Sequence, residues 1–485
     1  MRTPRGAFLL ALVTTIPGLA LSVSGGDWTN AGGNQGRNGL SSELGPDSAT
    51  DVLWTGGRSS MIAWQPVIAG RRVFVVRQSQ FMPEQTGSPV VCMDLDDGHE
   101  VWFKTIPANQ GDWTTWLAGV SHGRVFVSRS GNGATVSAKL WALDAASGNH
   151  LWPTGSQDLI DAGPYDGVVF ADDGDPVVAS FRTIKRINAE DGTTVWTAAR
   201  VGSVSGNCGG AIHNGAVYVA DAVVGGHAIK KFDLVTGAFL YQSPVMAGFT
   251  IQNTPMVSPD GTIYLSRVQN NAGVDYFYAI NDNGSQMSIR WSAPAGYSTS
   301  SEFAVGNDGS VYMWGPVVQN AAFIERRAAA DGALISQTEA RIPADFAAPR
   351  LAVDRDGRVY FSNGAFSNGR LYSFNADLTQ RWSIPVPNIN IGAPALGEGG
   401  TLVVAGVGTN IFALRTDRPP ACGTADYNGD GDIGTDQDIE AFFACLGGSC
   451  CATCFEGGSD FNADGDAGTD QDIESFFRVL GGGPC

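Results

Sequence analysis

The sequence of 485 residues predicts an all-β fold, an eight-bladed β-propeller of four-stranded blades, followed by a small C-terminal domain of calcium loops and helices. Two observations predict the propeller: a glycine-rich strand motif and a motif that ends in tryptophan both recur through the middle of the chain. Repeats of about 40–50 residues built from short strands and glycine turns are typical of propeller blades. A third observation predicts the separate C-terminal domain, because the last part of the chain is acidic, cysteine-rich and contains one loop twice.

Charge and composition exclude several classes of protein. Hydrophobic residues make up 43% of the chain, which is enough for a packed core and is not typical of a disordered chain. The 48 Asp and Glu residues outnumber the 30 Lys and Arg residues, so the formal net charge is −18. Because binding to a phosphate backbone needs clustered cations, we exclude nucleic acid as a partner.

The N-terminus is expected to be an export signal. Arg2 and Arg5 precede a short apolar run over residues 6–23, which a proline interrupts and small residues follow. We assign residues 1–24 to a signal peptide, with a membrane anchor as the alternative, and residues 25–50 to an N-terminal extension. No other segment reaches about 18 uninterrupted apolar residues, so no transmembrane span is expected in the mature protein. The expected location is secreted or in the cell envelope, either periplasmic or extracellular.

Two motifs repeat between residues 51 and 418 and predict the blades. A Gly-x-apolar-aromatic motif stands at residues 123–126, 167–170, 215–218, 261–264, 309–312 and 357–360. A second motif of an acidic residue, a glycine turn and an aromatic residue ends at Trp54, Trp102, Trp152, Trp196, Tyr241, Trp291 and Trp382, with Ile335 as an aliphatic substitute. The mean spacing is about 47 residues, and a sheet of that size must stack on like sheets to bury both faces.

The two ends of the repeat region predict how the ring closes. The last copy, residues 393–416, has inner strands but no terminal tryptophan strand, whereas residues 51–55 have that strand with no copy before it. We expect the N-terminal strand to pair into the last blade. This pairing would complete eight blades and remove the exposed sheet edges.

The D-x-x-x-G-x-x-x-W pattern, seen for example in residues 144–152, resembles the tryptophan-docking motif of the PQQ-like (quinoprotein-type) eight-bladed propeller family. The resemblance extends over residues 51–418 and implies the propeller fold. The family includes quinone-dependent dehydrogenases and cofactor-free scaffold proteins of bacterial envelopes. The resemblance alone therefore leaves the function open.

A quinone-dependent dehydrogenase would need a cation held by carboxylate and amide oxygens in the central channel. Counting back from each glycine predicts the channel-facing residues Trp64, Trp116, Asp161, Cys208, Asn253 and Glu302. The acidic and amide members of this set have suitable oxygens. However, the quinone enzymes that the chain resembles typically carry adjacent cysteines inside the propeller, whereas Cys92 and Cys208 are far apart. The sequence therefore favours a non-catalytic propeller without PQQ over the alternative, a PQQ-dependent dehydrogenase.

Other residues of the propeller have structural interpretations. Trp113 and Trp116 would suit a carbohydrate platform, with packing in the core or at the rim as the competing interpretation, so a polysaccharide-binding or polysaccharide-degrading role is a second alternative. Cys92 falls on a strand position and is expected to be a buried free thiol.

The C-terminal segment, residues 419–485, contains two copies of an acidic loop that start at Asp426 and Asp460. Side-chain oxygens at loop positions 1, 3 and 5, followed by glycine at position 6, are what a tightly wound Ca²⁺ loop needs, with a backbone carbonyl at position 7. The predicted ligands are Asp426, Asn428, Asp430, Asp432, Asp438, Asp460, Asn462, Asp464, Asp466 and Asp472. The sequence therefore predicts two Ca²⁺ sites, each followed by a helix.

The last ligand of each loop is left open. In the first loop Gln437 stands at position 12, where an acidic ligand is expected, so either Asp438 or Asp436 would have to bind. A competing interpretation is that Thr435 and Asp438 form a capping box at the start of the helix. The second loop presents the same choice 34 residues later.

This duplicated loop–helix pattern resembles dockerin-type modules, the EF-hand-like domains that end many secreted bacterial proteins. The resemblance implies attachment to a partner protein or to the cell surface, with a cohesin-like protein as the expected counterpart. Six of the eight cysteines lie in this segment. Disulfides are expected in an oxidising compartment, and the pairing stays open. The sequence therefore predicts a secreted binding or scaffold propeller that is tethered through a calcium-binding tail.

Overall fold

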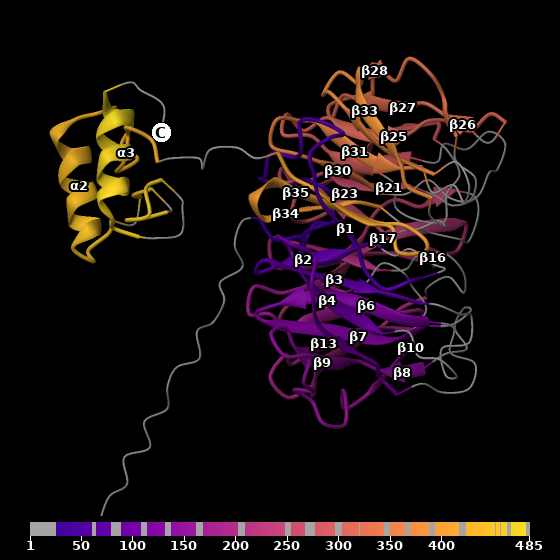
Figure 1. The fold of residues 1–485 in the computed structure, drawn as a ribbon. Coiled ribbons are helices and arrows are strands. Elements are labelled where there is room, and N and C mark those ends of the chain that lie inside the picture. The colour runs from indigo at the N-terminus through magenta and orange to yellow at the C-terminus, as the bar shows by residue number, and fades with distance from the viewer. Residues whose placement is uncertain are drawn as a thin grey trace, which may run out of the picture. The chain divides into compact units, whose positions relative to one another are not determined.

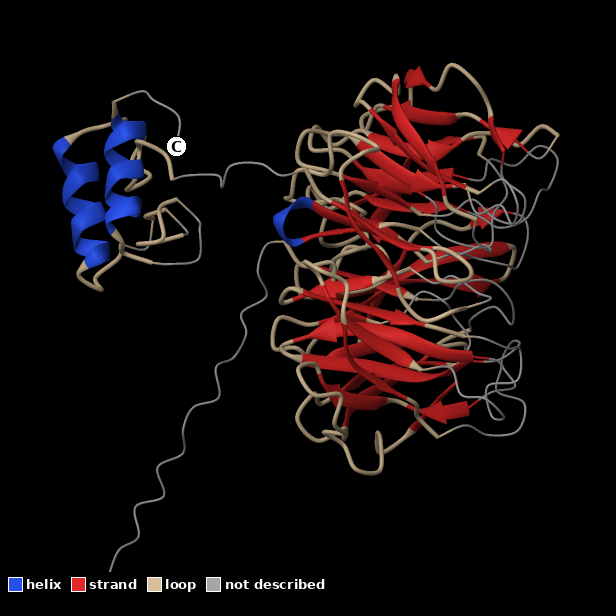
Figure 2. Cartoon of the chain, viewed as in Figure 1, coloured by secondary structure: helices blue, strands red, loops and turns tan. Residues whose placement is uncertain are grey.

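The computed structural model describes residues 26–60, 65–78, 89–107, 114–130, 137–161, 168–201, 209–247, 254–266, 277–295, 303–319, 321–343, 350–363, 369–387, 393–416, 423–451, 453–455, 457–462 and 467–481. The chain divides into two compact units, Met1–Arg415 and Thr416–Cys485. Figure 2 shows strands and turns in the first unit, whereas the two long helices belong to the second. None of the described helices is long and apolar enough to cross a membrane.

The first unit is an eight-bladed β-propeller, and each blade is an antiparallel sheet whose strands follow one another from the inside outward (Figure 1). Blade 1 contains β2 (Val67–Ala69), β3 (Arg72–Val76), β4 (Val90–Asp94) and β5 (Glu100–Lys104). Blade 2 contains β6 (Thr114–Ser121), β7 (Arg124–Ser130) and β9 (Trp141–Asp144), while β8 (Ser137–Lys139) pairs with β10 (Leu159–Asp161). Blade 3 contains β11 (Val169–Phe170), β12 (Pro176–Ala179), β13 (Thr183–Ile187) and β14 (Thr194–Ala199).

The next three blades repeat this order. Blade 4 contains β15 (Gly210–His213), β16 (Ala216–Val223), β17 (Gly226–Asp233) and β18 (Phe239–Gln242), with β19 (Met246–Ala247) also paired to β17. Blade 5 contains β20 (Met256–Val257), β21 (Ile263–Ser266), β22 (Phe277–Asp282) and β23 (Met287–Ala293). Blade 6 contains β24 (Phe303–Val305), β25 (Val311–Trp314), β27 (Ile324–Arg327) and β28 (Leu334–Gln337), and beside it β26 (Ala321–Ala322) pairs with β29 (Ile342–Pro343).

The last two blades complete the ring. Blade 7 contains β30 (Leu351–Val353), β31 (Val359–Ser362), β32 (Arg370–Phe374) and β33 (Gln380–Pro385). Blade 8 contains β34 (Ala395–Gly397), β35 (Thr401–Ala405) and β36 (Ile411–Leu414), with the short 3₁₀ turn η2 (Glu398–Gly400) between β34 and β35. Its fourth strand is β1 (Val52–Gly56) from the start of the chain, which pairs antiparallel with β36. The predicted closure by the N-terminal strand is therefore confirmed.

Five of the recurring tryptophans donate a hydrogen bond to the next blade. The indole N–H of Trp54 in β1 donates to the carbonyl of Leu95 in blade 1 at 2.8 Å. The same bond to the following blade runs from Trp102 to Ala145, Trp152 to Ala189, Trp196 to Leu234 and Trp291 to Ala329. The ring of Trp54 lies on Gly98, where a Cβ atom would approach it to 2.5 Å. The motif thus combines a flat aromatic face with a glycine that leaves room for it.

Counting the channel-facing residues back from each glycine assumes that the Gly-x-apolar-aromatic motif lies on the second strand of its blade. In blade 3 this assumption is wrong, because Val169 and Phe170 form the innermost strand β11. The turn that follows contains Gly174, whose N–H bonds the carbonyl of Ala171, and β12 begins after it. An inner and a second strand of a propeller blade are both buried apolar runs, so their composition does not tell them apart.

The second unit packs two helices, α2 (Asp436–Leu446) and α3 (Asp470–Leu480), around an aromatic core. Phe442 and Phe476 stack at 4.1 Å between ring centroids and are buried with Tyr427 and Phe461. Disulfides join Cys445 to Cys450 and Cys451 to Cys454. Cys422 and Cys485 lie outside the described residues.

Candidate functional site

The first candidate calcium loop is wound around the carboxylate of Asp426. Its two oxygens accept the backbone N–H groups of Asp430 and Gly431, each at 3.1 Å. The side-chain oxygens of Asn428 and Asp430 accept the N–H groups of Asp430 and Asp432, each at 2.9 Å. Side-chain oxygens of loop positions 1, 3 and 5 are thus gathered on one tight turn. The donor set is the hard-oxygen set that Ca²⁺ prefers, and these residues would hold the ion.

Asp438 caps the helix and is also hydrogen-bonded to the start of this loop. Its side chain is fully buried. One carboxylate oxygen accepts the N–H groups of Tyr427 and Asn428, and the other accepts the N–H and hydroxyl of Thr435. Burial by itself raises the pKa of the Asp438 carboxyl, but these hydrogen bonds together hold the pKa below its ordinary value. A carboxylate has about four acceptor positions, and here all four are used, two by the capping box with Thr435 and two by backbone N–H groups of the loop.

The second loop repeats this arrangement where it is described. The buried carboxylate of Asp472 accepts the N–H and hydroxyl of Thr469 at 2.8 and 2.9 Å, and the N–H of Asn462 at 3.2 Å. Asp460 is described, whereas Asp464 and Asp466 lie outside the described residues. Asp436 and Asp470, the alternative last ligands, are the exposed first residues of α2 and α3.

The residues expected to line the channel for a quinone are described only in part. Of these, Trp64, Cys208, Asn253 and Glu302 lie outside the described residues, as does Trp113 of the expected carbohydrate platform. Asp161 belongs to β10, which pairs with β8, so it is not on the inner strand of blade 3 as predicted. The error follows from the misassigned motif of that blade.

Two further residues of the propeller are part of its core. Trp116 on β6 is 4% exposed and packs with Phe126 and Phe170 between blades 2 and 3, so it offers no carbohydrate platform. Cys92 on β4 is the buried free thiol that the sequence predicts, and burial raises its pKa to about 12.

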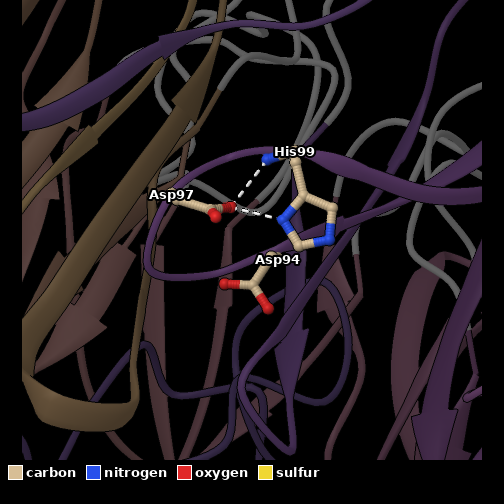
Figure 3. A group of neighbouring side chains, drawn as sticks. All are labelled: Asp94, Asp97 and His99. Atoms are coloured by element: carbon tan, nitrogen blue, oxygen red, sulfur yellow. Dashed lines mark hydrogen bonds and ion pairs between the residues drawn. The ribbon is translucent and has the colours of Figure 1, made fainter.

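Asp94, Asp97 and His99 form a cluster in which possible metal-ligand atoms, one from each side chain, lie within 4.8 Å of one another (Figure 3). The sequence motifs do not predict a metal site here, and the side chains of the cluster are already engaged in hydrogen bonds and ion pairs. Asp97 accepts the N–H of His99 at 2.9 Å, and Asp94 forms an ion pair with Arg72. Because these bonds shape the turn that carries Gly98 under Trp54, we interpret the cluster as structural.

The N-terminal extension forms a strap, residues 27–41, that sequence reasoning missed. Its backbone bonds the inner strands of six blades, at Ile68, Val120, Ile212, Val257, Val305 and Val353. The hydroxyl of Ser41 donates to the carbonyl of Leu396 in blade 8, and the Gln35 amide donates to Asp172 in blade 3. The strap therefore contacts the blades in ring order and runs around the inner strands of the propeller.

Buried polar side chains fix the strap in place. Arg37 is fully buried and donates from Nε to the carbonyl of Gly210 at 2.6 Å and from Nη1 to the carbonyl of Ala31 at 2.8 Å. The amide of Asn38 donates to the carbonyl of Val257 at 3.0 Å and accepts from Asn34 at 2.7 Å. The available signal was a tryptophan and an arginine within a segment otherwise rich in Gly and Asn.

Comparisons with known proteins agree with this architecture. Residues 86–314 match the family model PQQ_2, described as outer membrane protein assembly factor BamB. A search of the curated proteins found no match.

Solved structures of similar fold include enzymes and an assembly factor. A europium-containing methanol dehydrogenase superposes with a TM-score of 0.55 at 13% identity, over 80% of this chain and 91% of that chain. A quinohemoprotein alcohol dehydrogenase from Comamonas testosteroni gives a TM-score of 0.54 at 14% identity, over 90% of this chain and 87% of that chain. BamB from Moraxella catarrhalis gives a TM-score of 0.50 at 12% identity, over 75% of this chain and 99% of that chain. At these identities the likeness concerns the fold alone, an eight-bladed β-propeller.

Proposed function

We propose that the protein is a non-catalytic binding or scaffold propeller, secreted or held in the cell envelope, and that a calcium-binding, dockerin-like tail attaches it to a partner protein or to the cell surface. The observation that carries the proposal is the strap of residues 27–41, which is hydrogen-bonded to all eight blades.

The strap supports a scaffold role because it fixes the ring from inside. Its hydrogen bonds reach residues as far apart in the chain as Ser41 and Leu396. A ring held both by β1 in blade 8 and by a strap across all blades keeps its shape while presenting other loops for binding. Binding surfaces are commonly loops that a rigid scaffold positions.

The tail supports the attachment role through its paired acidic loops. The oxygens of Asp426, Asn428 and Asp430 are gathered on one turn. Without a bound cation these groups repel one another, so Ca²⁺ would tighten the loop and the helix after it. We propose one Ca²⁺ in each loop and no PQQ in the propeller.

A PQQ-dependent dehydrogenase is the second candidate, because solved proteins of this fold include the methanol and alcohol dehydrogenases named above. The test is reconstitution of the purified full chain with PQQ and Ca²⁺, followed by removal of excess quinone. We expect no quinone absorbance in the protein and no alcohol-dependent reduction of a dye. Retained quinone together with dye reduction would overturn the non-catalytic proposal, and a known quinoprotein reconstituted in parallel controls the procedure.

A further inference from the structure

A pocket of about 560 Å³ opens beside the strap, at the turns of blades 3, 4 and 5. The strap contributes Asp27, Asn34 and Gln35 to its wall, and the blades contribute Asp172 and His213. This volume lies within the range of about 300–1,000 Å³ that small-molecule sites occupy. The pocket is separate from the calcium loops, because all its lining residues belong to the propeller unit.

The pocket lies where the strap is bonded least closely to the ring. The described strap makes backbone hydrogen bonds to blade 2 through Thr29 and to blade 4 through Gln35, but none to blade 3 between them. At blade 3 the contact is a side-chain bond, from Gln35 Nε2 to Asp172 Oδ1 at 2.7 Å. This bond holds the Asp172 carboxylate at the edge of the opening.

The wall offers free acceptors, whereas most of its side-chain donors are already engaged: the Asn34 amide donates to Asn38 and Leu40, and the Gln35 amide donates to Asp172. The lining contains two carboxylates, Asp27 and Asp172, and no lysine or arginine. Among the described residues, Asp172 forms no ion pair and its second oxygen accepts no hydrogen bond. Burial lowers the pKa of His213, so this ring is neutral at pH 7 and adds no positive charge.

We propose that this pocket binds a small amino sugar, that is, a protonated primary amine on a hydroxylated ring. The ammonium group supplies both the positive charge and the donors that the wall lacks, and it lies against Asp172. The hydroxyl groups of the sugar ring donate to the remaining acceptors, among them the side-chain Oε1 of Gln35. This inference does not depend on the calcium-binding tail or on the proposed scaffold role.

The experiment titrates the full chain with glucosamine and follows binding by calorimetry. Glucose and N-acetylglucosamine are the matched ligands without a charged amine. We expect glucosamine to bind at least tenfold more tightly than either neutral sugar. Absent glucosamine binding, or equal binding of the three sugars, would overturn the proposal.

Two variants locate the site. Asp172→Asn keeps the size of an exposed side chain and removes its charge, and we expect it to weaken glucosamine binding at least tenfold with an unchanged melting temperature. Asp331→Asn makes the same change on an exposed turn in blade 6 and is expected to bind as the wild type does. Equal binding by the wild type and Asp172→Asn would place glucosamine elsewhere and overturn the proposal.

Discussion

Trp54 and Gly98 lie in contact although they belong to the last and the first blade of the ring, and a Cβ atom on Gly98 would stand 2.5 Å from the indole. The Trp54 N–H also bonds the carbonyl of Leu95 at 2.8 Å. One aromatic side chain therefore joins the two ends of the propeller.

Replacement of Trp54 by alanine tests this junction. Trp54 is 8% exposed, so we expect Trp54→Ala to cost about 3–5 kcal/mol of unfolding free energy through lost burial, a cavity and a lost hydrogen bond. Chemical denaturation of the full chain measures the effect. Exposed Leu240→Ala serves as control and should change stability little. A cost below 1 kcal/mol for Trp54→Ala, on the order of a surface change, would contradict the role of this residue.

Gly98 separates the effect of the contact from that of backbone strain. Gly98 and Gly123 share a φ of +72°, but a Cβ on Gly123 would meet nothing within 4 Å. Both alanine variants bear the strain of a left-handed backbone, about 1–2 kcal/mol. We expect Gly98→Ala to lower the free energy of unfolding by at least about 1 kcal/mol more than Gly123→Ala does, because overpacking also displaces the indole. Equal midpoints of denaturation for the two variants would contradict the prediction, because they would show that the indole moves aside without loss of stability.

The strap is tested through Asn38, whose side chain bonds Val257, Asn34 and the N–H of Leu40. Asn38→Ala removes these hydrogen bonds from a buried site, and we expect the free energy of unfolding to fall by about 1–3 kcal/mol. Hydrogen exchange should accelerate at the amides that the strap holds, such as Val305 and Val353. Asn149→Ala, at an exposed turn, is the control. Unchanged exchange at these amides would show that the strap does not depend on Asn38.

Calcium binding is tested in the first loop. Asp426→Asn is expected to weaken Ca²⁺ binding to the full chain at least tenfold, because it removes the charge around which the loop is wound. Calorimetric titration after treatment with a chelator measures the affinity.

Asp436→Asn and Asp438→Asn then decide the last ligand. If Asp438 is only a cap, its variant lowers the melting temperature with and without Ca²⁺ and leaves the affinity unchanged, whereas a ligand lowers the affinity.

The junction of blades 4 and 5 carries a pH dependence. Tyr241 occurs there at the position of the repeated tryptophan, and Asp282 accepts from Tyr241 at 2.7 Å and from Lys231 at 2.8 Å. Burial by itself raises the pKa of the Asp282 carboxyl, but the bonds from Lys231 and Tyr241 hold the pKa below its ordinary value. The folded protein therefore binds this proton less tightly than the unfolded chain does. The stabilisation is present above the ordinary pKa and is lost as the pH falls through the folded-state pKa.

Asp282→Asn should accordingly flatten the acid limb of the stability curve. We expect the melting temperature of the wild type to fall more steeply than that of the variant between about pH 5 and about pH 2. At neutral pH the variant should be less stable by about 3 kcal/mol, because it leaves Lys231 without its counter-ion. Calorimetry over this pH range measures both effects. Parallel curves for the two proteins would contradict the assignment to Asp282.

Much of the propeller could be predicted because its signals are local. The aromatic at the end of each copy, the glycine turn and the unmatched strand around Trp54 predicted the closure that β1 and β36 make. The misassignment in blade 3 has a local cause too. Residues 168–170 and the second strand β12 are both buried and apolar, so only the hydrogen-bond order tells them apart.

The candidate site was predicted unevenly for the same reason. The spacing of Asp426, Asn428 and Asp430 is a property of five consecutive positions and predicts a wound loop by itself. Asp438 bonds the loop through the N–H of Tyr427 and caps the helix through Thr435, and this double contact depends on the backbone path between loop and helix, which residue types do not specify.

The sequence by itself determined the blade repeat, the closing strand and the acidic loops, because periodicity and turn chemistry act between residues close along the chain. Only the tertiary structure decided the path of the strap and the pocket beside it. Ser41 and Leu396 are 355 positions apart, and Gln35 and Asp172 are 137 apart. No local pattern encodes such pairs, because the ring must close before their polar groups can meet.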